Sequence, residues 1–82
     1  MDVRRVIGEN VRRIRLKADL SQEAVAEAMG VDRAYISALE LGQRNVTVIS
    51  LWRVAEALGV ETYTLLQEQP PVSSLKKRST KK

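Results

Sequence analysis

The 82-residue chain has no cysteine and no histidine. Without cysteine it can form neither a disulfide bond nor a thiolate metal site. Without histidine it lacks the base of Ser-His and Cys-His catalysis and the most common metal ligand. Its four glycines are scattered, so it has no glycine-rich phosphate loop. We therefore expect a protein that is not an enzyme and that needs no metal or cofactor.

Long apolar stretches are also missing. No stretch approaches the roughly 18 consecutive apolar residues that a membrane-spanning helix needs, and no signal peptide is recognisable before the first predicted helix. The length allows one small domain. These features predict a cytoplasmic protein with no membrane partner and little room for a small-molecule effector.

The positive charge of the chain is concentrated at one end. The formal net charge is +4, but five of the fourteen bases lie within residues 76–82. Residues 1–75 carry the other nine bases against ten acids. The high pI therefore does not by itself indicate that the folded part binds nucleic acid. We predict one domain over residues 1–69 and a basic, disordered tail over residues 70–82.

Apolar spacing predicts an all-α chain of five helices, over residues 3–18, 22–29, 33–41, 48–58 and 61–67. Start and stop residues flank the middle three helices: Ser21, Asp32 and Thr47 as N-caps, then Gly30, Gly42 and Gly59 as terminators. The apolar stripes predict the inward residues Val3, Ile7, Val11, Ile14, Val25, Ala26, Met29, Val48, Leu51, Val54, Ala55 and Leu58. Spacing does not decide whether Val60, Leu65 and Leu66 belong to the core or to the dimer interface.

The second and third helices meet at a tight corner beside Gly30, which is the plan of a helix-turn-helix. A helical projection places Tyr35, Ile36, Leu39 and Glu40 on one side of the third helix, and Arg33, Ala34, Ser37, Ala38 and Leu41 on the other. The second side is small, with one long base at its leading end. Small side chains allow a helix backbone to approach base edges in the major groove. The alternative is an alanine face packed on another helix.

Taken together, these motifs resemble the Cro/C1 repressor-type, or Xre-like, helix-turn-helix family. The resemblance covers residues 7–60 and rests on VRRIR, LSQEAVAEAMGV, RAYISALELG and ISLWRVAEALGV. The string R-x-Y-I-S-x-x-E-x-G-x-R-N is also similar to the controller proteins of restriction–modification systems. The family implies a compact five-helix, lambda-repressor-like bundle. It implies a homodimer that binds pseudo-palindromic operators in double-stranded DNA at the nucleoid and regulates transcription.

Two positions depart from the family pattern. Asp19 stands where many members have glycine, which makes the backbone conformation at the end of the first helix less favourable. Leu41 stands where many have a polar residue, which leaves an apolar group near the expected DNA face or near a neighbour.

The third helix and the family pattern together assign roles to individual residues. Arg33, Ala34 and Ser37 are expected to read bases, with the Arg33 fork matching guanine O6 and N7. The family implies contacts with the DNA backbone from Gln22, Tyr35, Ser37, Arg44 and Asn45. It also implies that Gln22 braces the side chains of the third helix. Arg15 and Glu40 are implied to form a structural ion pair between the first and third helices.

Surplus apolar residues predict a second surface. Ile49, Trp52 and Tyr63 lie outside the expected core stripe and are candidates for the dimer interface. Alternatively, Trp52 covers the core of the monomer. Rival functions are a phage- or plasmid-type repressor, an antitoxin, or a protein-interaction module that kept the fold without base readout.

Overall fold

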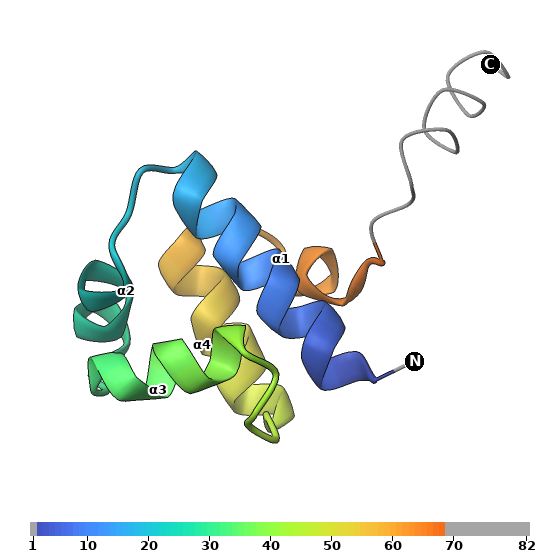
Figure 1. Ribbon diagram of the computed structural model, residues 1–82. Helices are drawn as coiled ribbons and strands as arrows, with labels where there is room; N and C mark the ends of the chain where they lie inside the picture. The colour runs from blue at the N-terminus through green and yellow to red at the C-terminus, as the bar shows by residue number, and fades with distance from the viewer. Residues whose placement is uncertain (1, 69–82) are drawn as a thin grey trace, which may run out of the picture.

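The computed structural model of the protein describes residues 2–68, and the predicted tail over residues 70–82 lies outside this range. Four α-helices surround one core: α1 (Val3–Lys17), α2 (Gln22–Met29), α3 (Arg33–Glu40) and α4 (Val48–Leu58) (Figure 1). A short 3-10 helix, η1 (Thr62–Leu66), follows α4. No strand is found among residues 2–68, and no helix there is long and apolar enough to cross a membrane. Each α-helix lies within one residue of its predicted bounds.

The prediction of five α-helices is wrong at the last element, because residues 62–66 form a 3-10 helix. Its defining bonds join residues three apart, as in the Thr64 amide that donates to the Glu61 carbonyl at 3.0 Å. The segment has only five residues, two of them β-branched threonines that favour helix weakly. Tertiary contacts with α1 and α4 therefore decide its conformation.

A buried asparagine of α1 holds η1 in place. The Asn10 side-chain amide donates to the Leu65 and Gln67 carbonyls, both at 2.8 Å, and its oxygen accepts from Arg13 Nη2 at 2.9 Å. Asn10 is 1 % exposed, and the Leu65 side chain is fully buried. The terminal carbonyls of η1 thus find their donor in another helix, as a short helix end requires.

The core consists mainly of the predicted stripes of α1, α2 and α4 together with Ile36, Leu39 and Leu65. Two predicted core residues are instead on the surface: Val3 is 50 % exposed and Val48 is 81 % exposed. Each is the first residue of its helix. No helical turn precedes it, so the apolar stripe ends there and the side chain does not reach the core. In α1, Val6 is buried beside Ile7.

Helix α1 lies close to the C-terminal end of α3 at Gly8. An added Cβ on Gly8 would lie 2.5 Å from the Leu39 carbonyl oxygen and 2.7 Å from that of Glu40. Only a residue without a side chain fits this contact, which fixes the position of α3 against α1.

Candidate nucleic-acid interface

The α2–corner–α3 unit is built by local signals in the sequence. Ser21 caps α2 by accepting from the Ala24 amide at 2.9 Å. Gly30 ends α2 with a left-handed φ of 72°, and the Val31 amide then donates to the Ala26 carbonyl. Asp32 holds the N-cap position of α3 but makes no side-chain capping bond. The leading end of α3 is therefore free of a capping carboxylate contact, and Arg33 is its first residue.

The two sides of α3 differ as the projection predicts. Ile36 and Leu39 are buried in the core and Tyr35 is half-buried against it. The outer side carries Ala34, which is exposed, and Ser37 and Ala38, which are half-buried. No long side chain projects from the middle of this side, so another molecule can approach the α3 backbone closely.

A chain of polar contacts connects the interior to Arg33. Arg15 Nε donates to Glu40 Oε2 at 2.6 Å, and Arg15 Nη2 donates to Glu40 Oε1 at 3.1 Å. Gln22 Nε2 donates to the same Glu40 Oε1 at 3.0 Å. Arg33 Nη1 then donates to Gln22 Oε1 at 3.0 Å. Four residues from α1, α2 and α3 thus form one hydrogen-bonded row that ends at the surface.

The inner part of this row is desolvated and ionic. The side chains of Arg15 and Glu40 are 8 % and 3 % exposed. The hydrogen bond from Arg15 to Glu40 raises the pKa of the guanidinium above its ordinary value, so the arginine stays charged. A buried pair of this kind adds little net stability, but the loss of one partner leaves an unpaired charge.

The loop after α3 carries Arg44 and Asn45, the two further residues that the family pattern assigns to DNA backbone contacts. The Arg44 guanidinium lies over the Tyr35 ring, 4.2 Å from its centroid, a cation–π contact that orders both residues. Asn45 is exposed and its side-chain oxygen accepts from Arg4 Nη1 at 3.5 Å. Arg4 was not predicted to lie here. It is 41 positions away in the sequence, so no local pattern could indicate this contact.

Leu41 follows α3 directly and is 66 % exposed. An apolar side chain is therefore exposed at the C-terminal end of the α3 outer side, where many members of the family have a polar residue. The other departure, Asp19, has a left-handed φ of 62°, a conformation that glycine adopts at lower cost.

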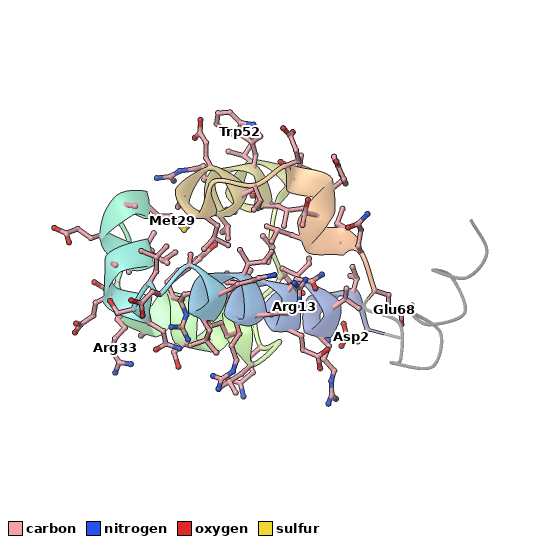
Figure 2. The ribbon with its side chains drawn as sticks, turned by 90° about the horizontal axis from the view of Figure 1, so that it is seen from above. Asp2, Arg13, Met29, Arg33, Trp52 and Glu68 are labelled. Carbon is pink, nitrogen blue, oxygen red and sulfur yellow. The ribbon has the colours of Figure 1, made fainter. Side chains whose placement is uncertain are left out.

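A separate apolar surface lies on α4 and η1. Ile49 is 71 % exposed, Trp52 54 % and Tyr63 63 %. Trp52 therefore does not simply cover the core. Two more apolar residues of α4 and η1 are exposed: Val48, which was predicted to lie in the core, and Leu66, which the sequence left open between core and interface. In Figure 2, Trp52 and Arg33 point outward at opposite edges of the domain. We refer to the five exposed apolar residues as the α4–η1 apolar surface: Val48, Ile49, Trp52, Tyr63 and Leu66.

The sequence and the fold of this chain are similar to those of known proteins. The Serratia marcescens control protein C.SmaI is 42 % identical over 69 residues, which cover 84 % of this chain and 82 % of that protein. The crystal structure of the restriction–modification controller protein C.AhdI from Aeromonas hydrophila superposes with a TM-score of 0.72 at 37 % identity, covering 76 % of this chain and 94 % of that chain. The structure of the C.Esp1396I tetramer with its natural 35 base-pair operator has a TM-score of 0.72 at 29 % identity, with coverage of 79 % and 86 %.

The family model described as helix-turn-helix, HTH_3, matches residues 11–65, from the middle of α1 to η1. This span contains the α2–α3 unit, α4 and most of the core. The chain belongs to the HTH_3, or Xre-like, family of helix-turn-helix proteins.

Proposed function

We propose that this protein is a sequence-specific regulator of transcription that binds double-stranded DNA as a homodimer, of the controller type found in restriction–modification systems. The observation that carries the proposal is the outer side of α3. It is made of small residues, and its leading arginine is held by the hydrogen bond that it donates to Gln22 of the neighbouring helix. A surface of this shape and chemistry fits the major groove.

Base recognition rests mainly on Arg33. Its Nη1 is held by Gln22, while among the described residues its Nε and Nη2 have no hydrogen-bond partner. That edge can donate two parallel hydrogen bonds to guanine O6 and N7, a contact worth about 1–3 kcal/mol of discrimination. Ala34 offers an apolar contact to a thymine methyl, and the Ser37 hydroxyl can reach a base or a phosphate.

Phosphate contacts set the register of α3 in the groove. Gln22 lies at the first position of α2, where the positive end of the helix favours an anion. Arg44 and Asn45 are exposed in the loop after α3, and Tyr35 lies beneath the Arg44 guanidinium. Together with Ser37, these residues flank α3 and can grip the DNA backbone.

A second copy of the chain is the proposed occupant of the α4–η1 apolar surface. Two-fold pairing would present two α3 helices about 34 Å apart, which matches successive major grooves on one face of DNA. The relatives support this arrangement, since the solved C.Esp1396I complex is a tetramer on a 35 base-pair operator. We accordingly expect a pseudo-palindromic operator in the nucleoid. Nothing in the fold favours the rival repressor, antitoxin or interaction-module roles over this one.

Selection from a random 30-mer duplex library, followed by sequencing, tests the proposal. The wild-type protein should enrich a palindromic consensus with half-sites one turn apart. Arg33→Ala should lose preference at one base pair per half-site and cost about 1–3 kcal/mol per site there. Enrichment of no consensus by the wild-type protein would instead favour an interaction module.

A further inference from the structure

The row of hydrogen bonds behind Arg33 has a fixed direction. Glu40 is a carboxylate and can only accept, so the Gln22 amide must present its Nε2 donor inward to it. The Gln22 oxygen is then turned outward, where it accepts from Arg33 Nη1. The opposite amide orientation would place oxygen against the buried carboxylate and a donor against the guanidinium, which are both repulsive.

We propose that Glu40 is a specificity-positioning residue for base recognition. It acts through Gln22 on Arg33 and does not contact DNA itself. This inference deepens the proposed function and rests on it, because it requires that Arg33 reads a base.

Burial makes Glu40 able to enforce this direction. Its side chain is 3 % exposed and is held by both Arg15 donors, so it can neither rotate away nor exchange its partner for water. Arg15 also donates to the Leu20 carbonyl at 2.9 Å, which ties the ion pair to the segment just before α2. Gln22 is half-buried and Arg33 is exposed. The fixed Glu40 carboxylate therefore orients Gln22 through one hydrogen bond, and Gln22 orients Arg33 through a second.

Holding the arginine in advance sharpens recognition. A long, exposed arginine otherwise populates many rotamers, and ordering it on binding opposes the gain from its hydrogen bonds. With Nη1 held by Gln22, the Nε–Nη2 edge keeps a fixed direction toward the groove. A bidentate arginine–guanine contact separates right from wrong bases by roughly 5- to 150-fold, and part of this factor should depend on Glu40.

The test measures discrimination at single base pairs. Dissociation constants are determined for the selected consensus duplex and for duplexes altered at the base pair whose preference Arg33→Ala abolishes. Glu40→Gln replaces the acceptor-only group by an amide of the same size, so the direction of Gln22 is no longer dictated. We expect discrimination at that base pair to fall by about 3-fold or more, and at the other base pairs to remain.

Three further variants keep the result decisive. Gln22→Met leaves the Arg15–Glu40 pair intact and removes the intermediary, and it should show the same loss at the same base pair even if Glu40→Gln folds poorly. In an Arg33→Ala background, Glu40→Gln should cause no further loss there. Glu9→Gln, an exposed site on α1, matches the change of charge and controls for long-range attraction of phosphates.

Unchanged discrimination at the Arg33 base pair in Gln22→Met, or an equal decline at all base pairs, would overturn the positioning role while leaving Arg33 as the reader. If Arg33→Ala itself alters no base preference, the proposed readout fails, and the role of Glu40 fails with it.

Discussion

Replacing Gly8 by alanine should destabilise the protein, although the local sequence favours the change. Gly8 lies inside α1, where alanine is normally preferred over glycine by about 1 kcal/mol. The structure predicts the opposite sign. The new Cβ would lie 2.5 Å and 2.7 Å from the carbonyl oxygens of Leu39 and Glu40 and 2.9 Å from the Glu40 carbonyl carbon.

The size of the destabilisation depends on which atoms must move to make room for the Cβ. The obstructing atoms belong to the α3 backbone, so no side-chain rotation relieves the contact, and α1 and α3 must separate. Overpacking of a core typically costs about 1–3 kcal/mol, occasionally more, and a contact with backbone should fall at the upper end. After the helix preference of alanine is offset, a net loss of about 2 kcal/mol remains. At 4–8 °C per kcal/mol, the Tm should fall by about 8–16 °C.

Thermal unfolding followed by circular dichroism provides the assay. One protein concentration is used throughout, because the proposed dimerisation would make the Tm depend on concentration. Gly30→Ala is the matched control. It has the unfavourable φ of 72° but no atom within 4 Å of the added Cβ, so its cost of about 1 kcal/mol is conformational only. A Gly8→Ala protein with an unchanged or higher Tm would refute the close contact between α1 and α3.

Two other substitutions test contacts away from α3. Asn10→Ala removes the donor to the Leu65 and Gln67 carbonyls and should lower the free energy of unfolding by about 2 kcal/mol in denaturant titrations, whereas the exposed Asn45→Ala should change it little. Equal effects of the two would show that Asn10 does not hold η1. Trp52→Ser should raise the dimer dissociation constant about 30-fold in sedimentation experiments, as expected when a residue worth about 2 kcal/mol of association is lost. Leu16→Ser on α1 has the same exposure, 53 % against 54 %, and should leave the constant unchanged, so similar effects of both would contradict an interface at Trp52.

Local patterns were sufficient to predict the helices and the two sides of α3. Caps such as Ser21 and left-handed glycines such as Gly30 act within a few residues of themselves, so their effect can be read along the chain. The inward and outward positions of α3 follow from its period of about 3.6 residues. The same reasoning failed at Val48, because periodicity does not say whether the first turn of a helix reaches the core.

The roles of Gly8, Asn10 and Gln22 could not be predicted in this way. In the sequence Gly8 is only a residue that weakens a helix mildly, whereas in the fold it allows α1 to lie against the backbone of α3. Asn10 is an ordinary polar residue on α1 until η1 is folded against it, 55 positions along the chain. The family resemblance suggested that Gln22 braces α3, but its partner inside the protein and the direction of its amide depend on the buried Glu40 carboxylate.

The sequence by itself therefore determined an all-α helix-turn-helix whose third helix begins at Arg33 and has small residues on its outer side. Those features depend on interactions between residues three or four positions apart. Only the tertiary structure decided that residues 62–66 form a 3-10 helix, that Val48 joins the α4–η1 apolar surface, and that Arg33 is held from the interior. These features arise from contacts between different helices, and their energies depend on distances that no local spacing encodes.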